Sequence, residues 1–239
     1  APLVARGGTD NKIIGNTIFN GGRDGINYNG NRCEIAYNDV YKSNLIADDC
    51  ATFYTVGGPQ NTEIHHNWFH DSASRGSKRK AAGIYLDNDA EAFSVHHNVV
   101  WNVEWTGVQI NWNGKNIDIF NNTLVKTKGG AMGAWHKAGT AFSNVKVWNN
   151  IADVKNVDDP TTQEDEGTFE RDADKQNNII TKVGFTNYQG NNFTLTSSSP
   201  AVDTGRIISK ITDNFKGKAP DAGAYELGAK NWVAGINWD

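Results

Sequence analysis

The sequence predicts an all-β protein folded as a parallel β-solenoid of about seven coils, and two observations carry this prediction. The first is composition, because 30 of the 239 residues are Asn, a residue that forms helices poorly and turns well. The second is a short pattern that recurs along the chain, in which an apolar residue stands three places before an Asn and another stands two places after it. Period-two alternation within each copy is typical of strands.

A chain of this length buries about 70% of its unfolded surface as one domain. No stretch approaches the roughly 18 consecutive apolar residues of a membrane helix, and the net charge of -4 argues against a nucleic-acid binder. We therefore expect neither a membrane nor a nucleic acid as partner.

The opening APLVARGG is not a signal peptide. Cys33 and Cys50 either form a disulfide or remain two thiols.

An asparagine anchors each copy of the repeated pattern, as in IIGNTIF and IHHNWFH. The seven anchors are Asn16, Asn38, Asn67, Asn98, Asn122, Asn150 and Asn178. Their spacings of 22, 29, 31, 24, 28 and 28 residues are too irregular for a tandem helical array but suit coils with constant strands and variable loops. We expect the Asn side chains to stack at a bend and hydrogen-bond to one another, because a buried amide is costly to leave unpaired.

The apolar positions on either side of each Asn are expected to face the interior, as with Ile64 and Phe69 around Asn67. A second type of strand recurs between the Asn motifs and mostly opens with glycine, in GINYNG, ATFYTVGG, GIYLDND, GVQINWNG and GGAMGAW. Each coil therefore has at least two strands. At about 4.8 Å per coil, seven coils extend over roughly 35 Å.

The repeat ends near Ser197. We expect residues 1–196 to form the coils and residues 197–239 to form a capping segment of the same domain, which covers the last coil and prevents edge-to-edge association. No matching cover precedes the first coil. Another segment of a longer protein, a second chain or the short arm APLVARGGTD is expected to cover it.

These segments together resemble a known group of proteins. The Asn-centred coils, NDVYKSNLIADDCATFYT, GIYLDNDAEAFSVHHNVVWN and the closing SPAVDTG and PDAGAYE are similar to the right-handed parallel β-helix proteins of bacterial polysaccharide degradation. Within that group, the pairing of DCATFYT with a later GIYLD resembles glycoside hydrolase family 141, which includes a fucosidase and a xylanase. The resemblance implies a right-handed β-helix that acts on a polysaccharide or oligosaccharide and is secreted or periplasmic.

Two carboxylates are the candidate catalytic groups. Asp49 stands just before one glycine-type strand and Asp87 near the end of the equivalent strand in the next coil, and we expect both near the same edge of the solenoid. Glycoside hydrolysis needs such a pair, with one acid to protonate the leaving oxygen and one carboxylate to attack or to activate water. Both residues equally suit turns. Asp48 and Asp89 flank the pair and are alternative candidates.

Four cations occupy the loop SRGSKRK, namely Arg75, Lys78, Arg79 and Lys80. The loop precedes GIYLDN, so we expect it to lie above the cleft, where Arg75 and Lys78 would hold a uronate or sulfate group by charge-assisted hydrogen bonds. The same residues suit a polysaccharide lyase, in which Lys or Arg abstracts a proton. A solvated surface loop is the plainer alternative.

Aromatic and amide side chains are expected to bind the sugar. Indole rings stack on the apolar face of a pyranose, and outward amides and rings on successive coils suit a glycan groove. The predicted substrate-binding residues are Tyr54, Arg75, Lys78, Tyr85, Asp89, Trp105, Gln109, Asn111, Trp112 and His136. Ordinary packing is the alternative for any single Trp.

The histidines are spaced as in some metal sites, but we predict no metal site among them. Alternation points His65 outward and His66 inward, where His66 shares its position with Tyr37, His97 and Asn121 in an interior polar stack. We predict no cofactor. Calcium held by carboxylates is left open, although no acidic loop has a recognised calcium-binding spacing.

The function predicted first is glycoside hydrolysis through Asp49 and Asp87 by a secreted or periplasmic enzyme. A lyase that cleaves a uronate-containing glycan by β-elimination is one alternative. A non-catalytic, glycan-binding β-helix segment of a larger protein is the other.

Overall fold

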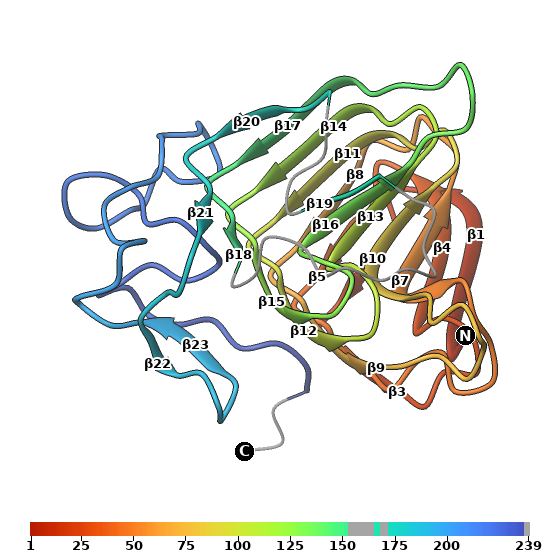
Figure 1. Cartoon of the computed structure of the whole chain (residues 1–239), viewed down its shortest axis with the longest axis horizontal. Coiled ribbons are helices and arrows are strands. Elements are labelled where there is room, and N and C mark those ends of the chain that lie inside the picture. The colour runs from red at the N-terminus through yellow and green to blue at the C-terminus, as the bar shows by residue number, and fades with distance from the viewer. Residues whose placement is uncertain (153–164, 168–171, 237–239) are drawn as a thin grey trace.

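A computed structural model describes residues 1–152, 165–167 and 172–236 of the chain. Over these residues the protein consists of β-strands and loops, without an α-helix. Accordingly, the described part of the chain contains no helix with the length and apolar character needed to cross a membrane. Three sheets of parallel strands, here named A, B and C, form the sides of a right-handed parallel β-helix (Figure 1).

Each of the three sheets takes one strand from each successive coil. Sheet A contains β1 (Leu3–Thr9), β4 (Ile26–Asn31), β7 (Cys50–Val56), β10 (Ala81–Asp87), β13 (Val108–Asn111) and β16 (Met132–Trp135). Sheet B contains β2 (Lys12–Ile14), β5 (Glu34–Ala36), β8 (Thr62–His65), β11 (Glu91–His96), β14 (Lys115–Phe120), β17 (Ser143–Trp148) and β20 (Asp174–Gln176). Sheet C contains β3 (Thr17–Phe19), β6 (Asp39–Tyr41), β9 (Trp68–Ser72), β12 (Val99–Val103), β15 (Thr123–Thr127), β18 (Ile151–Ala152) and β21 (Ile179–Ile180).

Six coils contribute a parallel strand to every sheet. In a seventh coil, β20 and β21 continue sheets B and C, whereas β19 (Asp165–Gly167) pairs antiparallel to β16. The predicted parallel β-helix is therefore confirmed, with slightly fewer complete coils than the seven expected. The glycine-type strands form sheet A, and each Asn motif supplies two short strands, one to sheet B and one to sheet C.

The predicted asparagine ladder is confirmed at the bend between sheets B and C. The Oδ1 atom of Asn98, for example, accepts hydrogen bonds from the backbone N and the Nδ2 of Asn67 at 3.1 and 2.9 Å. Its Nδ2 donates to the carbonyl oxygen of Ile64 at 2.8 Å. Equivalent side-chain links join every neighbouring pair of anchors from Asn16 to Asn178.

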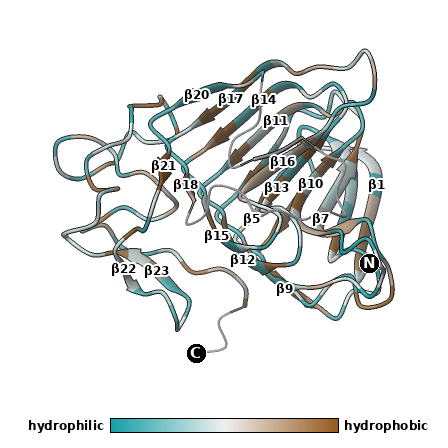
Figure 2. Cartoon of the chain, in the orientation of Figure 1, coloured by the Kyte–Doolittle hydropathy of each residue, from teal (hydrophilic) through white to brown (hydrophobic). Residues whose placement is uncertain are grey.

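The interior is apolar, as predicted. Ile64 and Phe69 are fully buried on either side of Asn67 and belong to one continuous core, and Figure 2 shows hydrophobic positions concentrated on the strands. Glycine opens several sheet A strands because successive coils approach closely at the bend between sheets C and A. A Cβ atom at Gly107 would lie 2.6 Å from the carbonyl oxygen of Ala131 in the next coil, which leaves no room for a side chain.

The non-repetitive C-terminal segment lies beside the coils, at the left of Figure 1. It begins with the hairpin of β22 (Phe185–Asn187) and β23 (Asn192–Leu195). Near its end the backbone N of Gly235 donates to the carbonyl of Tyr37 at 2.7 Å, and that of Ile236 donates to the Thr17 hydroxyl at 3.0 Å. The segment therefore reaches back to the first coil along the bend between sheets B and C. The predicted boundary between the coils (residues 1–196) and the capping segment (residues 197–239) stays a prediction.

The N-terminal arm is not a cover for the first coil, which corrects one of the expected arrangements. Residues Leu3–Thr9 form β1 and pair in parallel with β4, so they are the sheet A strand of that coil. Val4 and Phe19 of the first coil are 56% and 48% exposed. A cover from another segment or a second chain stays a prediction. Cys33 and Cys50 are both buried free thiols.

Candidate active site

A connected network of polar side chains lies on the outer face of sheet A. Tyr85, Gln109 and Asn111 form its centre and are 3%, 0% and 3% exposed. Their amides are oriented by a chain of hydrogen bonds in which Thr106 Oγ1 donates to Gln109 at 3.0 Å and Gln109 Nε2 donates to Asn111 Oδ1 at 2.9 Å. Asn111 Nδ2 is thereby directed at the Tyr85 hydroxyl, 2.6 Å away, and at Asp87 Oδ1, 3.0 Å away.

Asp87, the last residue of β10, is held on both of its oxygens. Oδ1 accepts from Asn111 and from the backbone N of Asn88 at 2.9 Å, and Oδ2 accepts from the Tyr54 hydroxyl at 2.7 Å. Three hydrogen bonds fix the orientation of this carboxylate, which remains half-buried. A carboxylate held in this way is suited to attack a substrate or to orient a water molecule.

Asp49 and Asp87 do not lie at the same edge of the sheet, which corrects the expected arrangement. The register pairs Cys50 with Ala81 and Val56 with Asp87, so Asp49 precedes one end of the strands and Asp87 ends the other. The Tyr85 side chain connects them, because its hydroxyl lies 3.4 Å from Asp49 Oδ1. Through Tyr85 and Asn111 the nearest oxygens of the two carboxylates are no more than about 9 Å apart. This bound allows the ~5 Å separation of retaining glycosidases and most of the ~6.5–9.5 Å range of inverting ones.

Both tyrosines of the network remain protonated hydrogen-bond donors at neutral pH. Burial, with the nearby charges of Asp87 and Asp49, raises the pKa of Tyr85 far above its ordinary value. Burial and the hydrogen bond to Asp87 also raise the pKa of Tyr54. The two rings contact edge to face, with centroids 5.3 Å apart. The site therefore places two neutral hydroxyl groups beside two carboxylates.

Three residues of this face were missed from the sequence. Asp24, 1% exposed, forms an ion pair with Arg23 at 2.7 Å and accepts a hydrogen bond from Asn27 at 2.7 Å. The Arg23 guanidinium also lies over the Tyr54 ring, 4.4 Å from its centroid. One signal was available, because Arg23 and Asp24 directly precede the glycine-type strand GINYNG. They add a buried carboxylate and a cation next to Tyr54.

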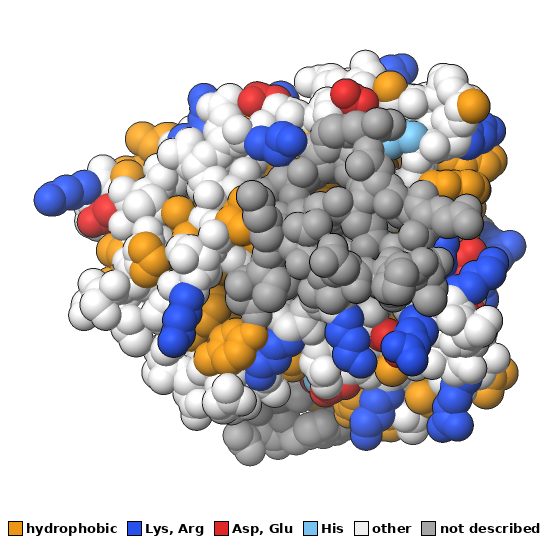
Figure 3. Space-filling model, viewed as in Figure 1, with side chains coloured by type: hydrophobic (Ala, Val, Ile, Leu, Met, Phe, Trp, Pro, Cys, Tyr) orange, Lys and Arg blue, Asp and Glu red, His pale blue; other side chains and the backbone are white. Residues whose placement is uncertain are grey.

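A cavity of about 410 Å³ opens on the same face. Its lining includes Arg6, Arg23, Asn27 and Tyr54. Such a volume accommodates a small-molecule group, and two guanidinium groups in the lining favour an anionic one. In the view of Figure 3, blue Lys and Arg side chains stand close to red acidic ones at the lower right.

The cationic loop lies at the Asp49 end of this face and is anchored by Asp48. The Asp48 carboxylate accepts hydrogen bonds from Ser74 Oγ at 3.0 Å and from the backbone N of Lys78 and Lys80 at 2.8 and 2.7 Å. Burial raises the pKa of Asp48, but these donors outweigh burial and lower it overall. Asp48 is thus a structural anchor and not an alternative to Asp49.

The cationic side chains of the loop are placed differently from one another. Arg75, Lys78 and Arg79 are exposed, whereas Lys80 Nζ lies 5.0 Å from the centroid of the Trp105 ring. Trp105 is 1% exposed and contacts Tyr85 edge to face at 5.4 Å. Trp105 therefore packs beneath Tyr85, so it supports the network and presents no open ring face.

Tryptophans gather at the Asp87 end of the face. The rings of Trp112 and Trp135 lie 6.4 Å apart, and Lys137 Nζ lies 3.3 Å from the centroid of Trp112. His136 contacts the carbonyl oxygen of Trp112 at 3.0 Å, and Asp89 accepts a hydrogen bond from Asn113 at 2.8 Å. The partly exposed Trp112 and the 38% exposed Trp135 present indole rings at the Asp87 end of the face, and their role in a glycan groove stays a prediction.

The one group of metal-ligating side chains found among the described residues lies elsewhere, at the bend between sheets B and C. His66, His96 and His97 place nitrogen atoms within 4.8 Å of one another. Nitrogen ligands of this kind suit zinc, copper or nickel and not calcium. Asp49 and Asp87 belong to no such group within the described residues.

The position of His66 differs from the prediction. His66 stacks between Tyr37 and His97 as expected, with centroids 4.9 Å from each, but the stack lies on the outside of the bend, where Trp232 of the C-terminal segment contacts His66. The residue before each Asn has a left-handed backbone, with φ of 54° at His66. This conformation breaks the strand alternation on which the inward prediction rested.

No family model matches the chain, so the resemblance to family 141 stays a prediction. No curated protein matches the sequence. Among solved structures, pectate lyase Pel9A is 13% identical with a TM-score of 0.46, over 88% of this chain and 69% of that one. XylC, solved in complex with xylose, is 20% identical with a TM-score of 0.41, over 59% of this chain and 27% of that one.

Proposed function

We propose that the protein is a secreted or periplasmic enzyme that hydrolyses a glycosidic bond of a polysaccharide or oligosaccharide on the outer face of sheet A. The observation that carries the proposal is the bridge between Asp49 and Asp87, in which Tyr85 contacts Asp49 at 3.4 Å and Asn111 joins Tyr85 to Asp87. Glycoside hydrolysis requires two carboxylates that can reach the same glycosidic bond.

The surroundings of the two carboxylates support different roles for them. Asp87 accepts three hydrogen bonds and is oriented by them, so we assign it to attack at the anomeric carbon or to activate a water. Asp49 is exposed and is contacted only weakly by Tyr85. It is therefore free to exchange a proton with the leaving oxygen and serves as the general acid.

Substrate binding is assigned to both ends of the face. Trp112 and Trp135 would stack on the apolar faces of sugar rings beside Asp87, with His136 and Asp89 at the margin. Tyr54 and Arg23 would contact the sugar on the side of the 410 Å³ cavity. Arg75 and Lys78, exposed on the loop at the Asp49 end, would reach a more distant unit. Membership of family 141, as the sequence motifs suggest, is part of this proposal.

A lyase is the second candidate, and the cavity lined by Arg6 and Arg23 favours it. In β-elimination a base removes the proton at C5 of a uronate, the bond between C4 and the glycosidic oxygen breaks, and a C4–C5 double bond forms. The oxygen leaves with the neighbouring sugar and takes up a proton to become its hydroxyl group. One guanidinium would neutralise the uronate carboxylate, as a cation must for that proton to leave.

One assay distinguishes these reactions. The protein is incubated with a panel of neutral and uronate-containing polysaccharides, and reducing ends and ultraviolet absorbance are followed together. Hydrolysis produces reducing ends without absorbance, because only elimination creates a conjugated double bond. We expect reducing ends alone. Rising absorbance would identify a lyase, and the absence of both signals on every substrate would identify a non-catalytic glycan-binding protein.

Substitutions then test the two assigned residues. Asp49→Asn and Asp87→Asn should each lower turnover by at least about a hundredfold, the scale of general acid–base groups. Asp213→Asn is the matched control, because Asp213 is exposed and lies in the C-terminal segment, outside the assigned site. Wild-type turnover in either of the first two variants would remove that residue from the mechanism.

A further inference from the structure

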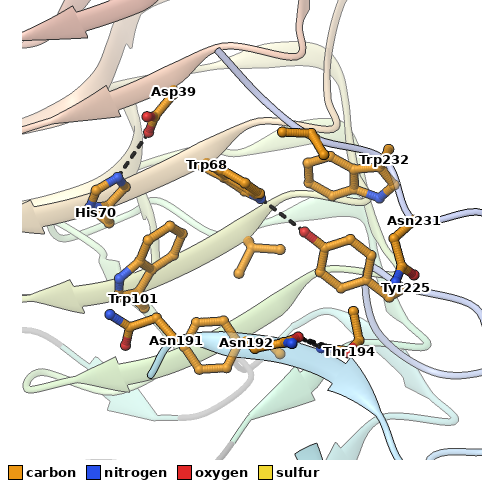
Figure 4. Close-up of a pocket in the computed structure, with 13 residues that line it drawn as sticks. Asp39, Trp68, His70, Trp101, Asn191, Asn192, Thr194, Tyr225, Asn231 and Trp232 are labelled. Atoms are coloured by element: carbon orange, nitrogen blue, oxygen red, sulfur yellow. Dashed lines mark hydrogen bonds and ion pairs between the residues drawn. The ribbon is translucent and has the colours of Figure 1, made fainter. Parts of the chain in front are cut away.

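A second cavity lies on a different side of the molecule from the candidate active site. It has a volume of about 510 Å³ and lies between the outer face of sheet C and the C-terminal segment (Figure 4). Strands β6, β9 and β12 form one wall, and the start of β23 with residues 225–233 forms the other. The volume lies within the range of small-molecule sites.

The walls of this cavity are aromatic and tied together. Trp68 Nε1 donates to the Tyr225 hydroxyl at 2.9 Å, and the Tyr225 ring stacks on Trp232 at 4.8 Å. Trp101, on the same wall as Trp68, stacks on His70 with centroids 4.0 Å apart. Contacts of this kind hold large rings in fixed positions, so the cavity is preformed and its aromatic surface costs little to order when a ligand binds.

One polar group in the wall has no partner. Trp101 is 7% exposed, and its indole Nε1 has no hydrogen-bond acceptor. A buried donor without a partner is costly, and indole N–H groups are usually satisfied when buried. Trp101 lines the cavity with its ring, whereas its Nε1 atom is closed off from solvent, so the ring surface is what Trp101 offers to a ligand.

The remaining polar groups of the lining suit hydroxyl groups and not anions. Asp39 and Asp71 hold His70 between them at 2.8 and 2.7 Å, and Asp39 itself lines the cavity together with Asn191, Asn192 and Asn231. No Lys or Arg is among the described lining residues. A carboxylate with amides beside indole rings is a chemistry that recognises an uncharged polyol with an apolar face.

We propose that this cavity is a second carbohydrate site, which binds a neutral pyranose unit of a glycan away from sheet A. The indole and phenol rings of Trp68, Tyr225 and Trp232 would contact the C–H surface of the sugar. Asp39 and the amides would accept from and donate to its hydroxyl groups, and the Trp101 ring would form part of the apolar wall. The site requires no catalytic activity, so it stands whether or not the proposed function does.

Titration calorimetry with neutral and charged oligosaccharides tests the site. The probes are xylohexaose, cellohexaose and mannohexaose on one side and hexagalacturonate on the other, each titrated into the full chain with Asp49→Asn present, which prevents hydrolysis. We expect at least one neutral oligosaccharide to bind and hexagalacturonate not to bind at this site. The absence of binding by all three neutral probes would overturn the proposal.

Matched tryptophan variants locate the binding. Trp101→Phe replaces the indole of the cavity wall with a smaller ring, so it should weaken the neutral ligand about tenfold, the scale of one lost aromatic contact. Trp148→Phe is the control, because Trp148 Nε1 also lacks a partner but does not line the cavity. Equal affinity of the two variants would overturn the proposal, and circular dichroism verifies that both are folded. Binding lost with Trp135→Ala but kept in Trp101→Phe would place the glycan on sheet A instead.

Discussion

Replacing one central rung of the asparagine ladder should destabilise the protein strongly. Asn98 is fully buried and takes part in four side-chain hydrogen bonds. It accepts from the backbone and the side chain of Asn67 and donates to Ile64 and Asn122. At about 1 kcal/mol net per hydrogen bond, Asn98→Ala should lower the free energy of unfolding by about 4 kcal/mol, which is a large part of the total for most domains.

Urea unfolding followed by circular dichroism measures this loss, and the ladder provides its own control. Asn16 is the first anchor and is only half-buried. Its side chain donates two hydrogen bonds, to Ile14 and Asn38, so Asn16→Ala should cost no more than about 2 kcal/mol. If Asn98→Ala were no more destabilising than Asn16→Ala, the ladder would not be a main source of stability.

Three further predictions concern pH, the cationic loop and the coil bend. Burial lowers the pKa of His66 to about 3 and also lowers the pKa values of His97 and His65. The unfolded chain therefore binds protons near pH 5 that the folded chain does not. Unfolding measured at about pH 7.5 and 5 should show a loss of stability, of which His66→Phe removes about 2 kcal/mol. Asp48→Ala removes the acceptor for the backbone N of Lys80, so trypsin should cut the loop several times faster than in wild type, and an unchanged rate would show that the anchor is dispensable. Gly107→Ala places a Cβ 2.6 Å from the Ala131 carbonyl and should cost about 1 to 3 kcal/mol, measured as a lowered Tm; an unchanged Tm would mean that the bend has room.

The repeat was readable from the sequence because every coil requires the same side chain at the same place. An amide that accepts from the coil below and donates to the coil above, as Asn67 and Asn98 do, has no substitute of equal geometry. The Asn motif is therefore recognisable in every coil, although the loops between successive motifs differ in length. The positions that flank it, such as Ile64 and Phe69, are predictable for the same reason, since both fill one continuous core.

The arrangement across the sheet A face was less predictable, because it depends on register and on side-chain reach. Strand alternation predicted that the Tyr85 and Gln109 side chains point outward. It did not predict how far apart Asp49 and Asp87 lie along the strand direction. The seven-residue strands β7 and β10 separate the backbones of Asp49 and Asp87, and the long Tyr85 side chain reconnects them. Arg23 and Asp24 lie in a loop that no other coil repeats, so periodicity could not select them.

The contrast between two faces of the helix supports a functional origin for the sheet A network. On sheet B, neighbouring coils pair opposite charges directly, as in Lys12 with Glu34 at 2.8 Å and Lys115 with Glu91 at 3.0 Å. Such cross-strand pairs stabilise stacking modestly and are the simplest solution for an exposed face.

Sheet A departs from that solution. Its carboxylates Asp49 and Asp87 are linked through a tyrosine hydroxyl and an amide and not through a cation. Gln109 and Asn111 are buried there, although a buried amide stabilises less than an apolar side chain unless every group is bonded. Stability alone would favour charge pairs or apolar residues at these positions. The arrangement instead links two carboxylates through one tyrosine and one amide, which is what the proposed hydrolysis between them would require.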